Sequence, residues 1–132
     1  MATPGLAWDF TPGTPCRLTH ETETARVELT FDPSAPLYSI TVSQTAPLPD
    51  APVFAMRFDG PVGLTISTNR HTLSGDGLSV TVEDVGFGNV LNGLQFNQTA
   101  TALLGGSEIA FPLAGAAGPV AAFRACRVVP SV

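Results

Sequence analysis

The two cysteines of the chain are the first residues whose chemistry can be judged from their spacing. Cys16 lies near the start of the sequence and Cys126 near its end, and neither belongs to a CxxC pair. A bond between them would close a loop of about 110 residues and contribute roughly 4–5 kcal/mol through chain entropy. We therefore expect a Cys16–Cys126 disulfide. Two buried free thiols, or a nucleophilic Cys126 with His20 or His71 as its base, are the alternatives.

The two histidines are candidates for metal binding. His20 has the same parity as Cys16 and Leu18 in an alternating segment, so we expect it to face inward as a hydrogen-bonded core residue. His71 lies in the segment TNRHT, where contact with solvent is expected. Because no HxH, HExxH or paired-cysteine spacing accompanies them, we expect no metal and no other cofactor.

The acidic residues could supply the two carboxylates that a glycosidase needs. Glu21, Glu23 and Glu28 have the parity of solvent-facing strand residues, and Glu83 and Asp84 form the polar end of a strand. No pair among them is singled out by its spacing. The serines lack the GxSxG and SxxK contexts of nucleophiles. The sequence therefore predicts a protein that is not an enzyme.

Alternation with a period of two predicts the elements that must position these residues. Apolar and polar residues alternate over 26–32, 38–44, 53–59, 62–68 and 78–84. Two more strands are expected at 16–21 and 108–113, and SGDG at 74–77 predicts a hairpin. We expect one mainly β domain over 1–132. It should be an antiparallel β-sandwich or partly open barrel of about seven or eight strands, with one or two short helices near the C-terminus.

The last third of the chain alternates less regularly. A short helix over 98–104, capped by Asn97, is favoured, and the alternative is a strand over 96–104 that turns at Gly105-Gly106. The segment GFGNVLNG at 86–93 lacks the GxGxxG spacing of dinucleotide-binding loops. We interpret it as a structural crossing between elements, with a functional loop as the alternative.

The closing segment AGPVAAFRAC predicts a short helix. Pro119 suits the first helical position, and Val120 and Phe123 fall on one face. This helix would seat on the sheet and carry Cys126.

Composition narrows the classes of partner. Hydrophobic residues make up 44% of the 132 residues, charged residues only 13%, and the formal net charge is −5 with no lysine. Such a chain repels phosphate backbones, so we expect no nucleic-acid partner. No apolar run approaches the ~20 residues of a membrane span.

Four residues are candidates for contact with a partner: Trp8, Phe10, Arg57 and His71. We interpret Trp8 and Phe10 as closing one end of the sandwich. An exposed aromatic pair that recognises a ligand or protein is the alternative.

The segments TPGTPCRLTH, ARVELTFDPSAPLYSIT, FAMRFDGPVGLTISTNRHTLS, GFGNVLNGLQF and FPLAGAAGPVAAFRAC carry a resemblance that spans nearly the whole chain. They resemble a group of small exported alphaproteobacterial proteins without an established activity, which are often named as components of excinuclease ABC. That name does not suit this chain, which has neither GxxxxGK[ST] nor a lysine to reach nucleotide phosphates.

A more distant similarity, over 97–126, is to the invasion-associated locus B proteins, although their closely spaced cysteines are missing here. The resemblance implies export and a β-rich fold. We expect a periplasmic or secreted domain whose leader has been replaced by Met1.

Three functions follow from these expectations. The first is a non-enzymatic domain that binds a protein or envelope component. The second is an inhibitor of a secreted hydrolase such as lysozyme or a protease, because an acidic protein is steered towards basic enzymes. The third is a small-ligand binder, which needs a hollow interior. The large inward residues Phe31, Phe54, Phe58 and Phe111 predict a filled interior instead.

Overall fold

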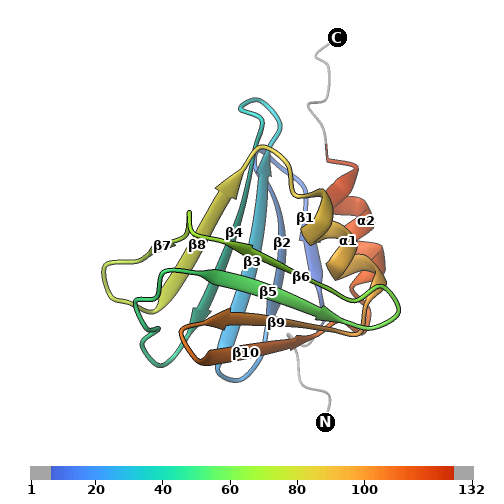
Figure 1. The fold of residues 1–132 in the computed structure, drawn as a ribbon. Coiled ribbons are helices and arrows are strands. Elements are labelled where there is room, and N and C mark those ends of the chain that lie inside the picture. Colours follow the sequence, from blue (N-terminus) through green and yellow to red (C-terminus); the bar gives the residue numbers. More distant parts are fainter. Residues whose placement is uncertain (1–6, 127–132) are drawn as a thin grey trace.

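Ten strands and two helices make up residues 7–126, the part of the chain that the computed structural model describes. The strands form two antiparallel sheets that pack face to face, and the helices lie side by side at one end of them (Figure 1). The predicted mainly β sandwich is confirmed. Residues 1–6 and 127–132 of the predicted domain lie outside the described residues.

Sheet A is the larger sheet, with the strand order β1-β2-β3-β4-β8-β7. Its strands are β1 (Asp9–Thr11), β2 (Cys16–Glu21), β3 (Ala25–Asp32), β4 (Leu37–Gln44), β7 (Thr72–Leu73) and β8 (Ser79–Asp84). Its buried face is apolar because alternate residues point inward. On its outer face hydroxyl groups of neighbouring strands bond to each other, as in Thr41 with Thr81 at 2.9 Å.

Sheet B has the order β10-β9-β5-β6. Its strands are β5 (Phe54–Asp59), β6 (Leu64–Thr68), β9 (Thr99–Leu104) and β10 (Ser107–Pro112). The two sheets diverge between β6 and β8, and no ladder joins these strands in the described part of the chain. The sheets therefore form an open sandwich.

The segment 98–104, favoured above as a helix, is instead strand β9. It turns through Gly105 and Gly106, with φ values of 54° and 91°, into β10. Two positive φ values suit a tight hairpin turn, and glycine adopts them without strain. The helix α1 (Gly88–Phe96) precedes β9, so Asn97 follows a helix and does not begin one.

Asn97 fastens the end of α1 to the turn between β5 and β6. Its buried amide accepts a hydrogen bond from the Val62 N–H (2.9 Å) and donates to the carbonyls of Val62 and Gly93 (3.0 Å each). Val62 belongs to the alternating segment 62–68 but is 54% exposed, because it lies in this turn, before the start of β6.

The helix α2 (Ala117–Arg124) begins two residues before Pro119, and its side chains Val120 and Phe123 are buried as predicted. A disulfide joins Cys126, just after α2, to Cys16 at the start of β2. The predicted disulfide is therefore confirmed, and the two alternatives for these cysteines are not needed.

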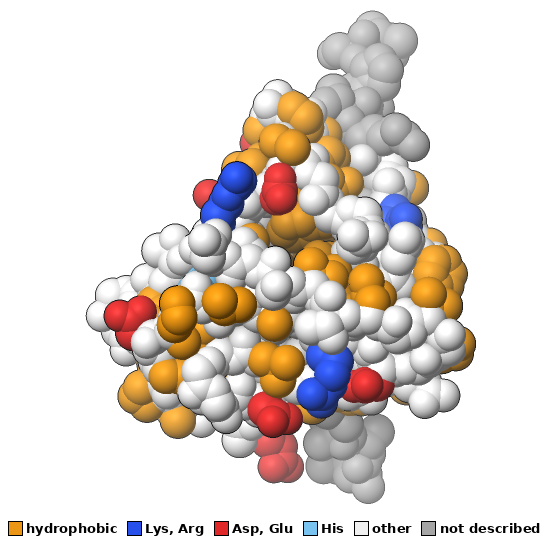
Figure 2. All heavy atoms as spheres, in the orientation of Figure 1, with side chains coloured by type: hydrophobic (Ala, Val, Ile, Leu, Met, Phe, Trp, Pro, Cys, Tyr) orange, Lys and Arg blue, Asp and Glu red, His pale blue; other side chains and the backbone are white. Residues whose placement is uncertain are grey.

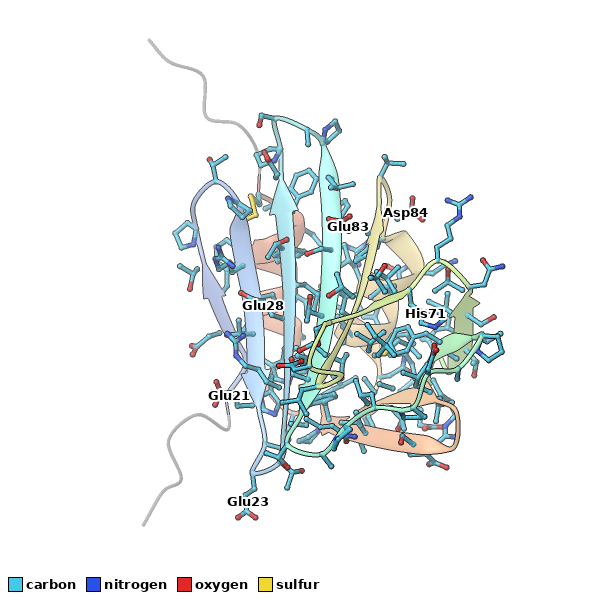
Figure 3. The ribbon with its side chains drawn as sticks, turned by 90° about the vertical axis from the view of Figure 1, so that its left-hand side faces the viewer. Glu21, Glu23, Glu28, His71, Glu83 and Asp84 are labelled. Atoms are coloured by element: carbon cyan, nitrogen blue, oxygen red, sulfur yellow. A yellow bond between two sulfur atoms is a disulfide. The ribbon has the colours of Figure 1, made fainter. Side chains whose placement is uncertain are left out.

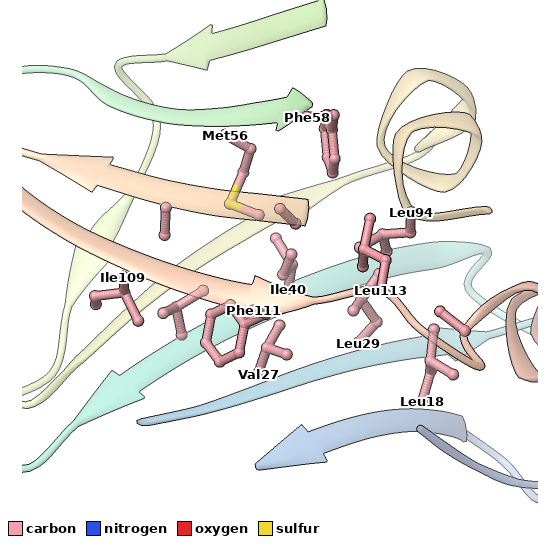
Figure 4. Packing of buried hydrophobic residues seen from close by; sticks show 14 of the residues in the cluster. Leu18, Val27, Leu29, Ile40, Met56, Phe58, Leu94, Ile109, Phe111 and Leu113 are labelled. Atoms are coloured by element: carbon pink, nitrogen blue, oxygen red, sulfur yellow. The ribbon is translucent and has the colours of Figure 1, made fainter. Parts of the chain in front are cut away.

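Side chains of both sheets meet in a common core (Figure 4). Phe58 and Phe111 of sheet B are almost fully buried against residues such as Leu29 of sheet A and Leu94 of α1. The interior is filled near the helices. Among the described residues, no helix is long and apolar enough to cross a membrane.

Candidate functional site

An open cleft lies where the two sheets diverge. It has a volume of about 640 Å³ and is lined by residues of β4, β5, β6, β8 and the start of α1. Figure 2 shows the hollow on this face, with hydrophobic side chains in its depth. Pockets that bind small molecules have volumes of about 300–1,000 Å³. Phe54, Phe58 and Phe111 are buried as predicted, and the cleft is an opening at the edge of this filled core.

Half of the residues that line the cleft are apolar, and most of these come from four strands whose alternation points apolar side chains inward. Met56 pairs with Ile66 across β5 and β6, and Ile40 pairs with Val82 across β4 and β8. The apolar residues that line the cleft are Ile40, Phe54, Met56, Ile66, Val82, Phe87 and Val90.

The start of α1 forms one wall. Residues 86–90 line the cleft, and the buried ring of Phe87 anchors the helix start against Tyr38, at a ring-centroid distance of 5.3 Å. No side chain caps the helix, and its first turn holds no acidic residue. The segment 86–93 thus contributes to the site, although its helical structure was not predicted.

The polar side chains of the lining are those of Ser67, Thr68, Arg70, Asp84 and Asn89. Arg70 follows β6 and Asp84 ends β8, so charges of opposite sign lie along the lining. The Asp84 carboxylate accepts a hydrogen bond from the Val85 N–H at 2.7 Å. An apolar interior with a few polar groups is typical of a site that orients an amphipathic ligand.

The strand β6 presents an unpaired edge beside the cleft. It pairs only with β5, and its sequence LTIST contains no charge and no proline. The opposite edge of sheet B is protected by Glu108 and Pro112 in β10. Charges and prolines usually prevent unwanted pairing at sheet edges, so β6 is the edge of sheet B that is open to strand addition.

Two of the residues predicted to contact a partner pack inside the molecule. Trp8 is buried, donates its indole N–H to the Pro112 carbonyl at 2.9 Å, and stacks on His20 with ring centroids 4.8 Å apart. Phe10 is half-buried against the same core. Trp8 therefore bridges the two sheets, as in the interpretation that it closes one end of the sandwich, and its ring is not available at the surface.

The other two predicted residues also bond within the chain. Arg57 lies on the outer face of β5 and donates to the Asp59 carboxylate at 3.1 Å. His71 is half-buried, and its Nε2 donates to the Ala51 carbonyl at 2.7 Å. His71 is therefore only partly exposed to solvent. None of the four predicted residues lines the cleft.

The acidic residues considered above are spread over sheet A (Figure 3). Glu28 and Glu21 form ion pairs with Arg17 and Arg26, so they stabilise the outer face of the strands. No three metal-ligating side chains gather anywhere in residues 7–126. His20 is 2% exposed, as predicted, and its Nε2 has no hydrogen-bond partner in the described structure.

Two aspartates have lowered pKa values, and both lie in turns far from the cleft lining. Hydrogen bonds from the Ser34 hydroxyl and N–H lower the pKa of Asp32, and hydrogen bonds from the Ser74 hydroxyl and the Leu78 N–H lower that of Asp76. Side chains that bond to nearby backbone in this way stabilise turns. These shifts are structural.

The inward residues of the strands that line the cleft could be predicted from the sequence, but the cleft itself could not. The alternation of their strands predicts that Ile66 and Val82 face inward. That they line the same cleft depends on the strand order, which the alternation does not give. No protein-family model matches this chain, and neither a curated protein nor a solved structure is similar enough to count as a relative. The resemblance to exported alphaproteobacterial proteins therefore stays a prediction.

Proposed function

We propose that this protein is a binding domain and that its ligand is a small, largely apolar molecule that occupies the cleft between the sheets. The observation that carries the proposal is the cleft itself, with a volume of about 640 Å³ and seven apolar side chains in its lining. The proposal narrows the binding role predicted from the sequence. It favours a small ligand over a protein, an envelope component or a secreted hydrolase.

Several apolar side chains of the lining are partly exposed to solvent, which favours the binding of a ligand. Ile66, Val82 and Val90 are only half-buried although they face the interior of the sandwich. Burying apolar surface is worth roughly 25 cal/mol per Å², so a ligand that covers these side chains gains affinity from the contact. A contiguous apolar surface of this kind commonly marks a binding site.

We place this activity in the periplasm or outside the cell. The disulfide between Cys16 and Cys126 supports that location, because such bonds form and persist in oxidising compartments.

A neutral probe and two valine variants test the proposal. 1-Decanol is titrated into labelled protein, and backbone amide shifts are followed by NMR. We expect the shifts to concentrate in β6, β8 and the start of α1. Val90→Trp should fill the cleft and weaken decanol binding about tenfold or more, since a few lost apolar contacts are worth ~1.4 kcal/mol.

The control is Val85→Trp, which adds the same ring to the same segment. Val85 is 72% exposed and does not line the cleft, so this variant should bind decanol as the parent does. Shifts scattered over the whole surface, or equal weakening by the two variants, would contradict the proposal.

An extended peptide that pairs with β6 is a second candidate, favoured by the unprotected edge of that strand. Peptides selected from a random library should then alternate apolar and polar residues. In the complex, amide hydrogens within 64–68 should exchange more slowly. Unchanged exchange in β6 would remove this candidate. Inhibition of a secreted hydrolase stays a proposal from the sequence, which an assay against lysozymes and proteases tests.

A further inference from the structure

Arg70 differs from the other arginines that the structure describes. The side chains of Arg17, Arg26 and Arg57 form ion pairs with carboxylates. Arg124 donates to the side-chain oxygens of Asn92 and Gln95 at 2.8 and 2.9 Å. Within residues 7–126 the guanidinium of Arg70 has neither an ion pair nor a hydrogen bond, and Arg70 is also the arginine that lines the cleft.

A hydrogen bond holds the backbone of Arg70. Its N–H donates to the Thr68 hydroxyl at 3.0 Å, which holds the residue directly after the edge strand β6. The side chain of Arg70 therefore extends from a fixed backbone position, and it lines the same cleft as the apolar side chains of Ile66 and Phe54. An arginine presents several N–H donors in a planar arrangement that matches the two oxygens of a carboxylate.

The charge around Arg70 limits where an anionic group of a ligand can bind. The chain has a net charge of −5, so its general field repels anions, and an unpaired arginine is a local exception. Asp84 and Asn89 also line the cleft, and Asp84 carries a negative charge. An acidic group is therefore favoured only at the Arg70 side, which fixes the orientation of the ligand.

We infer that the ligand of the cleft is a carboxylate-bearing amphiphile, such as a medium-chain fatty acid, with its apolar body between β6 and β8 and its carboxylate on the Arg70 guanidinium. This inference rests on the proposed function, because it names the class of molecule that the cleft binds. Arg70 then determines specificity for acids over neutral molecules of the same length.

Decanoate and 1-decanol form a matched pair of probes for this inference, since they differ in the head group alone. We expect the parent protein to bind decanoate more tightly than decanol. Arg70→Gln should weaken decanoate binding about fivefold, the usual worth of a partly exposed ion pair, and leave decanol binding within about twofold. Asp84→Asn should strengthen decanoate binding, because it removes a like charge from the lining.

Arg57→Gln is the control, since Arg57 pairs with Asp59 on the outer face of sheet B and lies outside the cleft. It should leave the binding of decanoate and decanol unchanged. Equal affinity for the two probes that is insensitive to Arg70→Gln would overturn the inference and leave the proposed function standing. Equal weakening by Arg57→Gln would also overturn it, because the effect would be one of net charge. Failure of both probes to bind would overturn the proposed function as well.

Discussion

Gly93 in α1 lies directly against the ring of Phe58 in β5. A Cβ atom at Gly93 would come within 2.4 Å of that ring, and Phe58 is 1% exposed and so has no free space to move into. Gly93→Ala should therefore displace α1 or Phe58 and lower the free energy of unfolding by about 1–3 kcal/mol. Urea denaturation followed by circular dichroism measures this change.

Gly118→Ala is the matched control in α2. No atom lies within 4 Å of a Cβ built there, so alanine should be neutral or stabilising by up to about 1 kcal/mol through its helix propensity. If the two glycine variants unfold at the same urea concentration, the result contradicts the close packing of α1 on β5.

Individual residues were predictable where local sequence decides their environment. The cysteine pair followed from spacing and size, and the inward position of His20 followed from its parity in β2. Arg70 could not be singled out, because a loop arginine carries no periodic signal. Its place in the lining depends on β6 being brought opposite β8, which is a property of the topology.

At the scale of elements, alternation predicted the strands that have one buried face. Strand β9 escaped this pattern because consecutive residues Ala100, Thr101 and Ala102 are all buried between β5 and β10. A strand with consecutive buried residues shows no alternation, so periodicity cannot distinguish it from a short helix. The helix α1 was not predicted because Gly88 and Gly93 have low helix propensity. Its close packing on Phe58 is a tertiary contact, which no local sequence signal shows.

At the scale of the whole molecule, the disulfide connects the start of β2 to the end of the described chain. The bond between Cys16 and Cys126 spans a sequence separation of 110 residues. Replacing both cysteines by alanine should lower the free energy of unfolding by about 2–5 kcal/mol, largely because the unfolded chain regains its freedom. The urea midpoint of this variant measures the loss. An unchanged midpoint would show that the bond does not constrain the unfolded chain.

The strand order is the property of the whole molecule that decides the site. Turn signals predicted the hairpin of β7 and β8, but the pairing of β8 with β4 joins residues about forty positions apart in the sequence, as in Thr41 with Thr81. Because β8 pairs there and β6 stays at the edge of sheet B, the sandwich is left open between them. Long-range pairing of this kind is not encoded in any local pattern.

A crystal structure of the protein with decanoate tests the central claim most directly. We predict that the decanoate chain lies between β6 and β8, against Ile66 and Val82, with its carboxylate about 3 Å from the Arg70 guanidinium. Decanoate bound elsewhere on the molecule, or a cleft occupied by the protein's own side chains with decanoate excluded, would contradict the claim that this cleft is the binding site.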